Sequence, residues 1–225
     1  MVSHFFQLLG FDSSIAAGGA FFIAFVIAVI FHEVAHGVVA LQLGDPTAKL
    51  AGRLTLNPIP HIDLWGTIIV PFLLYILPGG FIFGWAKPVP VNPFNVRGRY
   101  GMVLVALAGP ATNLILLTIF GLAARLAPVA TQLPAFFLVI ALVNGLLMFF
   151  NLIPIPPLDG SKVLYLFLEN RPDIRNFLER YSLFILLAIL LFLPGVITQF
   201  AFVPALQLTS YMSGFSVFDI IELLQ

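Results

Sequence analysis

Five apolar stretches, each long enough to cross a lipid bilayer, take up most of this chain of 225 residues. They cover residues 16–43, 64–83, 102–126, 133–155 and 181–208. At a helical rise of about 1.5 Å per residue, each can span a hydrocarbon core of about 30 Å. The pattern predicts an all-α, polytopic membrane protein. At residues 215–225, apolar side chains at helical spacing predict a short C-terminal helix.

The composition agrees with a membrane protein and restricts its chemistry. Hydrophobic residues make up 60% of the chain and charged residues 9%, with a mean hydropathy of +1.08. Ten basic residues balance ten acidic ones, so no excess of charge indicates a nucleic acid or an acidic substrate. Because the chain has no cysteine, a bound metal has to be held by nitrogen and oxygen atoms.

The second stretch, residues 64–83, allows two interpretations. Its helix is interrupted by Pro71, Pro78, Gly79 and Gly80. It can cross the bilayer, which gives five spans, or return as a re-entrant hairpin. If it returns, only Arg125 lies on one side of the membrane, and on the other side lie Lys49, Arg53, Lys87, Arg97, Arg99, Lys162, Arg171, Arg175 and Arg180. Because basic loops collect on the cytoplasmic side, the sequence favours four transmembrane helices plus a hairpin, with both termini outside.

The first stretch contains the sequence FHEVAHG at residues 31–37. Residues four apart share one face of a helix, so His32 and His36 can direct imidazole nitrogens at one point, with Glu33 beside them. In metalloproteases with this HExxH spacing, the histidines bind zinc and the glutamate is the general base. A lone histidine such as His4 is more simply a hydrogen-bonded structural residue. Three ionisable groups in an apolar helix are costly unless paired or functional, which predicts a metal site.

A catalytic zinc needs a third protein ligand and an open coordination position. The candidates are Asp159, His61 and Asp63. Asp159 lies in NLIPIPPLDG, residues 151–160, where three prolines break the helix at membrane depth; such backbone is tolerated where it lines a cavity or is buried in protein. An ordinary helix end with a turn is the alternative for this segment. His61 could also orient a ligand imidazole or supply interfacial polarity, and we favour interfacial polarity.

HEVAH and NLIPIPPLDG together resemble the site-2 protease family of intramembrane zinc metalloproteases, peptidase family M50. The resemblance includes GWAKPVPVN at residues 84–92 and AGPATN at residues 108–113, and covers about residues 16–165. It implies one catalytic zinc ion, and it assigns roles residue by residue. The zinc ligands would be His32, His36 and Asp159, the catalytic base Glu33, and the group that positions substrate or stabilises the oxyanion Asn151.

The resemblance implies hydrolysis of peptide bonds within or near transmembrane segments of membrane proteins, that is, regulated intramembrane proteolysis. The expected partners are a transmembrane protein or peptide substrate and the lipid bilayer, with no nucleic acid. We expect one membrane-embedded metalloprotease domain over residues 1–225, with a core at 16–165 and an additional span and C-terminal helix at 181–225. His36 and Asp159 reach the same side only if residues 64–83 fold back, which places the zinc near the cytoplasmic face of the cell membrane.

Two other classes of protein compete with this interpretation. A zinc transporter would carry metal-binding residues along several spans, whereas the polar residues here converge on one site. A catalytically silent binding protein would lack the base or a ligand, whereas Glu33, both histidines and Asp159 are present. The sequence assigns no role to Lys87 or Asn92 and no oligomeric state.

Overall fold

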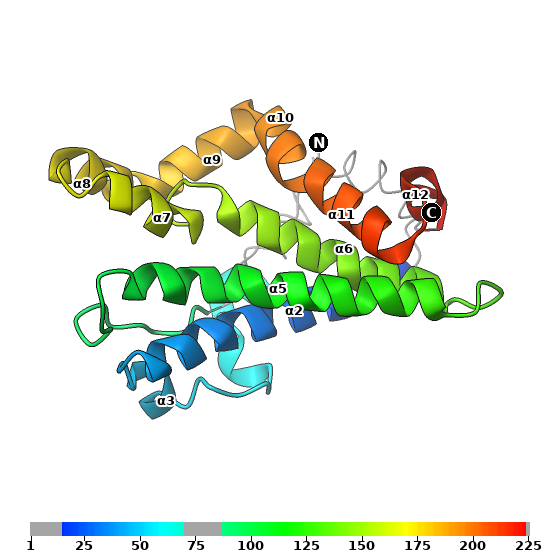
Figure 1. Cartoon of the computed structure of the whole chain (residues 1–225), viewed down its shortest axis with the longest axis horizontal. Coiled ribbons are helices and arrows are strands. Elements are labelled where there is room, and N and C mark those ends of the chain that lie inside the picture. Colours follow the sequence, from blue (N-terminus) through cyan, green and yellow to red (C-terminus); the bar gives the residue numbers. More distant parts are fainter. Residues whose placement is uncertain (1–14, 70–86, 224–225) are drawn as a thin grey trace.

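The computed structural model describes residues 15–69 and 87–223 (Figure 1). Within these ranges the chain forms helices and loops without a strand, which confirms the all-α prediction. Among the described residues, three helices are long and apolar enough to cross a membrane: α2 (Ile15–Gln42), α5 (Gly101–Leu126) and α6 (Leu133–Leu152). The chain is therefore a multi-pass membrane protein.

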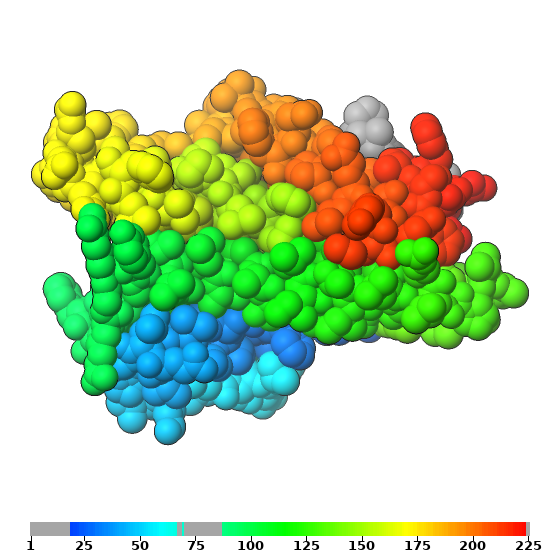
Figure 2. Space-filling model, in the orientation of Figure 1, coloured from blue at the N-terminus to red at the C-terminus, as the bar shows by residue number. Residues whose placement is uncertain are grey.

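Helix α6 is the centre of the bundle. It packs against α2 and α5, and α11 (Val203–Ser213) covers it from another side. Residues 138–145 of α6 are buried on every face of the helix, as expected for a helix that is apolar all round. Small residues allow the close approach: Ala24 and Ala28 of α2 have no exposed surface. Helix α5 forms the front surface along the length of the molecule (Figure 2).

The fifth apolar stretch is bent, where the sequence suggests one continuous span. It consists of α9 (Ser182–Phe192) and a second helix made of α10 (Pro194–Ile197), the π-helical segment η3 (Thr198–Phe202) and α11. The two parts meet at 93°. Pro194 explains the break, because proline removes a backbone donor and clashes with the preceding turn. Counted as one span, the bent pair gives the four predicted transmembrane helices.

Most of the predicted hairpin at 64–83 lies outside the described residues; its first turns form the π-helical segment η2 (Leu64–Ile69). The two flanks of this stretch are described, and they meet. The Lys87 N–H donates to the His61 carbonyl at 2.9 Å. The Arg53 guanidinium also bridges the flanks, with hydrogen bonds to the carbonyls of Pro60 and Lys87. The chain therefore returns to the point that it left, which supports the hairpin over a crossing.

The loops and short helices divide between the two ends of the bundle (Figure 1). One end carries α3 (Thr47–Leu50), α7 (Gly160–Phe167), α8 (Pro172–Arg180) and the start of α5. The 3-10 helix η1 (Ile59–His61) follows α3 in the chain. The opposite end carries the α5–α6 turn and the predicted C-terminal helix, α12 (Val217–Leu223). Arg125, in the last turn of α5, belongs to this second end. The arrangement agrees with the charge distribution of four spans plus a hairpin, while the single domain stays a prediction.

Candidate metal centre

His32 and His36 lie one turn apart on α2, on the face that packs against α5. Both side chains are buried, and their rings stand nearly perpendicular, with centroids 4.5 Å apart. The Nδ1 atom of His36 lies 2.7 Å from the carbonyl oxygen of Val105, on α5. Since a carbonyl only accepts hydrogen bonds, this Nδ1 carries the proton, and Nε2 presents its lone pair to the site. The Nδ1 atom of His32 lies 2.5 Å from Oδ1 of Asn113, also on α5.

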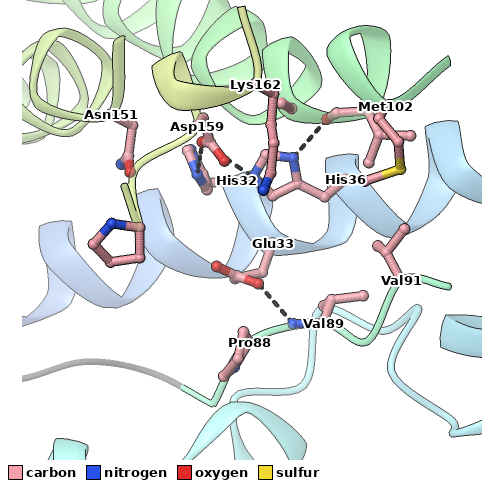
Figure 3. A pocket seen from close by; sticks show the side chains of 13 residues that line it. His32, Glu33, His36, Pro88, Val89, Val91, Met102, Asn151, Asp159 and Lys162 are labelled. Carbon is pink, nitrogen blue, oxygen red and sulfur yellow. Dashed lines mark hydrogen bonds and ion pairs between the residues drawn. The ribbon is translucent and has the colours of Figure 1, made fainter. Parts of the chain in front are cut away.

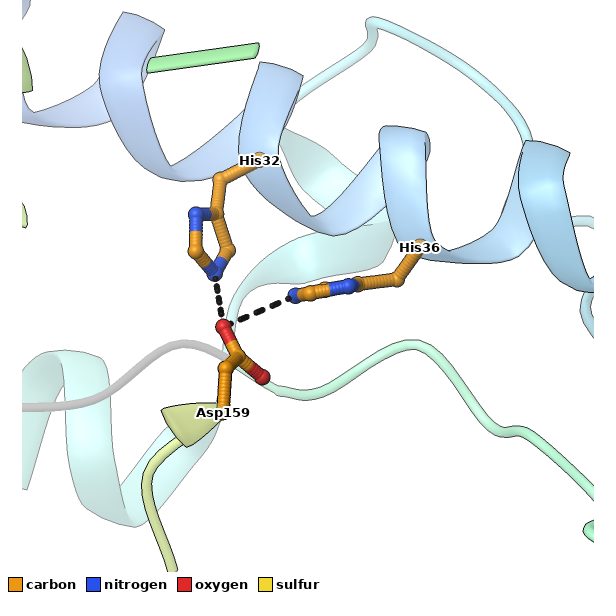
Figure 4. Close-up of side chains that lie close together, drawn as sticks. All are labelled: His32, His36 and Asp159. Atoms are coloured by element: carbon orange, nitrogen blue, oxygen red, sulfur yellow. Dashed lines mark ion pairs between the residues drawn. The ribbon is translucent and has the colours of Figure 1, made fainter. Parts of the chain in front are cut away.

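Asp159 reaches the two histidines from the broken segment that follows α6. Its Oδ2 atom lies 3.1 Å from Nε2 of His32 and 3.3 Å from Nε2 of His36 (Figure 4). Gly160 allows the segment to fold back on the end of α6, because a β-carbon there would lie 2.2 Å from the carbonyl oxygen of Leu152. The proline-rich segment thus lines the same cavity as the two histidines, through Pro157 and Asp159.

The three side chains fit a metal ion. Their ligand atoms lie within 4.8 Å of one another. The Oδ2 atom of Asp159 is buried and has no hydrogen-bond donor, and it faces the lone pair of His36. Two imidazoles and one carboxylate form a ligand set typical of catalytic zinc.

Glu33 lies on an adjacent face of α2, and its carboxylate points toward residues 87–91 (Figure 3). Its Oε2 atom accepts a hydrogen bond of 2.8 Å from the Val89 N–H. Glu33 and the three candidate ligands line the same cavity, which has a volume of about 270 Å³. The candidate base and the candidate metal ligands therefore line one cavity, an arrangement that hydrolytic chemistry requires.

Asn151 and Lys162 line the same cavity. The side-chain amide of Asn151 donates to the carbonyl of Leu147 in its own helix, at 3.0 Å. Its expected role toward the substrate stays a prediction. Lys162, two residues beyond the LDG sequence, brings a positive charge to the chamber that the motif by itself does not indicate.

The other two candidates for the third ligand are His61 and Asp63. Among the described residues, neither belongs to the cluster of side chains that could hold a metal ion. His61 is buried, with Nε2 2.9 Å from the carbonyl of Thr55, so it packs within its own loop, and its interfacial role stays a prediction. Asp63 accepts a hydrogen bond from the Gly66 N–H at 2.7 Å. Lys87 is exposed, and the Asn92 N–H donates to Asp45 at 2.6 Å. His4 lies outside the described residues.

Two residues of the sequence AGPATN shape the centre, although the motif alone assigned them no role. Gly109 faces the histidines: a β-carbon there would lie 2.5 Å from Cε1 of His32 and 2.6 Å from Cε1 of His36. Asn113 is the partner of His32 described above. Both lie far from the histidines in sequence, so only the packing of α5 on α2 reveals their place.

The sequence is similar to a known protein family and to several named proteins. Residues 121–193, which include Asn151 and Asp159, match the family described as Peptidase family M50. A Bacillus subtilis protein named "Putative zinc metalloprotease YwhC" is 44% identical over 153 residues, 63% of this chain and 66% of that protein. Rip2 of Mycobacterium tuberculosis, named in the same way, is 31% identical over 141 residues, 62% of this chain and 53% of Rip2.

A third similar protein, Rip3 of Mycobacterium tuberculosis, is 32% identical over 162 residues, which are 70% of this chain and 32% of Rip3. The chain therefore spans less than two thirds of the length of each of these relatives. No solved structure matches it.

Proposed function

Because the chain belongs to peptidase family M50, the site-2 protease family, we propose that it is an intramembrane zinc metalloprotease. It hydrolyses peptide bonds within or near transmembrane segments of membrane proteins. The observation that carries the proposal is the shared chamber: a carboxylate base and three metal-ligating side chains face one cavity in a membrane helix bundle.

We assign each side chain one role. His32, His36 and Asp159 hold a single zinc ion, which when bound polarises the scissile carbonyl and activates water. Glu33 takes a proton from the attacking water and passes it to the nitrogen of the leaving amine as the C–N bond breaks. Asn151 turns its amide from the Leu147 carbonyl toward the oxyanion and donates a hydrogen bond to it.

The substrate is a transmembrane protein or peptide whose helix unwinds locally, because helical carbonyls are already hydrogen-bonded. The unwound segment extends along the broken backbone after α6, whose helix ends at Leu152. Cleavage of such substrates is the chemical step of regulated intramembrane proteolysis. The basic loops near the chamber support a cell-membrane protein with its zinc close to the cytoplasmic face.

Cleavage of a panel of single-span peptides in proteoliposomes tests the proposal, with zinc content measured for each protein. We expect Glu33→Gln to keep its zinc and to lose cleavage by about 10²–10⁴-fold, the usual contribution of a general base. Glu222→Gln changes an exposed glutamate of α12 and serves as the matched control. Undiminished cleavage by Glu33→Gln would refute the assigned base. Bound zinc without cleavage by the wild type would favour a transporter or a binding protein.

A further inference from the structure

Two asparagines occupy the apolar interface between three spans. Asn113 of α5 and Asn144 of α6 have no exposed surface, and Asn113 also contacts α2. A buried amide in a membrane bundle is unfavourable unless its donors and acceptor are satisfied. Their hydrogen bonds form a chain that ends at His32.

Backbone carbonyls fix the direction of this chain. The Nδ2 group of Asn144 donates to the carbonyl of Ile140 at 2.8 Å, which leaves its Oδ1 to accept from Nδ2 of Asn113, also at 2.8 Å. The same Nδ2 of Asn113 donates to the carbonyl of Ala28 at 3.2 Å. Because carbonyl oxygens cannot donate, neither amide can be reversed without losing these bonds.

The direction of the amides determines the tautomer of His32. Oδ1 of Asn113 is an acceptor 2.5 Å from Nδ1 of His32, so Nδ1 has to carry a hydrogen. Nε2 then keeps its lone pair, on the side of the ring that faces Asp159. His36 reaches the same state through a backbone carbonyl, that of Val105, which no side-chain substitution can remove.

We propose that Asn113 is a positioning residue that holds His32 as the Nδ1–H tautomer, with Nε2 directed at the metal, and that Asn144 fixes the direction of the Asn113 amide. This inference rests on the proposed function, because it assumes that the site binds zinc. It extends that function in one respect: the metal centre and the contact of α2, α5 and α6 depend on the same buried hydrogen bonds.

Zinc affinity, measured by competition with a chromophoric chelator on the purified full chain, tests the proposal without relying on proteolysis. We expect Asn113→Leu to weaken zinc binding by about 10–100-fold, as found for groups that orient metal-ligating histidines. Asn113→Asp keeps an acceptor for Nδ1–H and should retain affinity within about threefold of the wild type. Asn144→Leu should weaken zinc binding by a factor between those of Asn113→Asp and Asn113→Leu. The control is Thr209→Val, which removes another fully buried polar group, on α11.

Each result decides the question. Wild-type affinity in folded Asn113→Leu, or an equal loss in Asn113→Leu and Asn113→Asp, would overturn the positioning role. If Asn113→Leu does not fold, Asn144→Leu decides, and unchanged affinity there refutes the chain of amides. If the wild type itself binds no zinc, the proposed function fails. A cobalt-substituted protein adds a second readout: we expect the wild-type visible spectrum in Asn113→Asp and an altered one in Asn113→Leu.

Discussion

At the metal centre, the space for the two imidazole rings depends on the absence of a side chain at Gly109. The nearest atoms of both rings lie 2.5–2.6 Å from the position that a β-carbon would take. Carbon atoms in contact are normally about 3.5–4.0 Å apart, so even a methyl group would displace the rings or separate α5 from α2.

We therefore expect Gly109→Ala to weaken zinc binding by at least about tenfold and to abolish cleavage, since either displacement breaks the alignment of His32 and His36. The matched control is Gly195→Ala in α10, where a β-carbon would have no neighbour within 4 Å. Zinc affinity and peptide cleavage of both variants are the measurements. Wild-type zinc affinity in Gly109→Ala would mean that the helices can separate without disturbing the site.

Sequence predicts the residues of this centre only where one element carries the pattern. The i, i+4 spacing of His32 and His36 is a property of a single helix, so it can be read directly. Asp159 is predicted as a ligand only from a second motif, and its contact with the histidines is predicted from the family resemblance. Asn113 lies 81 residues from His32, and only the packing of two helices brings them together. No local pattern distinguishes it from an asparagine that faces another neighbour.

On the scale of elements, the segment that begins at Lys87 contacts Glu33, the proposed catalytic base. Val89 is buried, and its N–H is the donor to Glu33. Its side chain packs over Gly37, whose missing β-carbon leaves room for it. Val89 stands between Pro88 and Pro90, and a residue before proline favours an extended conformation that proline itself can adopt.

The Val89→Pro substitution therefore removes the N–H with little change of backbone. We expect cleavage to fall roughly tenfold with zinc content unchanged, because the carboxylate of Glu33 loses a charge-assisted hydrogen bond. Val89→Ala keeps the N–H and truncates the same side chain, so it separates the bond from the packing. Equal activities of the two variants would contradict a positioning role for the backbone donor.

The turn after α2 is tied to the same segment by Asp45, whose carboxylate has no exposed surface. It accepts hydrogen bonds from the N–H and hydroxyl of Thr47, from the Asn92 N–H and from the amide of Asn95. Burial raises the pKa of Asp45, but these bonds outweigh it and lower the pKa from 3.8 to about 2. A group whose pKa is lowered by folding stabilises the fold above its unfolded pKa and loses this effect as the pH falls through its folded pKa.

We expect Asp45→Asn to reduce the free energy of unfolding by about 1 kcal/mol at neutral pH. The difference from the wild type should shrink between pH 4 and pH 2. Thermal unfolding in detergent over this pH range measures it. Asp173→Asn, at an exposed position of α8, is the control. If the difference in the free energy of unfolding between the two proteins stays constant with pH, the charge of Asp45 is not its cause.

On the scale of the whole molecule, hydropathy predicts the number of spans because each has to be apolar over its full length. The bend between α9 and α10 is harder to predict, since a proline in a membrane helix can kink it slightly or turn it by 93°. The central position of α6 in the bundle could not be predicted from the sequence either, because all five stretches are similarly apolar. Lipid and protein interior select the same residues, so composition alone does not distinguish a central helix from a peripheral one.

The topology can be tested with single cysteines, because the natural chain has none. The hydrogen bond between Lys87 and His61 requires that residues before and after the stretch at 64–83 lie on one side of the membrane. We expect Asn57→Cys, Phe94→Cys and Asn170→Cys to react with an impermeant maleimide only after cells are permeabilised, and Gln132→Cys to react in intact cells. All four positions are exposed.

The pair Asn57→Cys and Phe94→Cys decides between the two topologies, because five crossings would place them on opposite sides. Opposite labelling would also separate His36 from Asp159, since α5 and α6 would then enter from the other face. The proposed metal centre therefore requires the hairpin. If the protein binds zinc through His32, His36 and Asp159, the maleimide has to reach the two cysteines from the same side of the membrane.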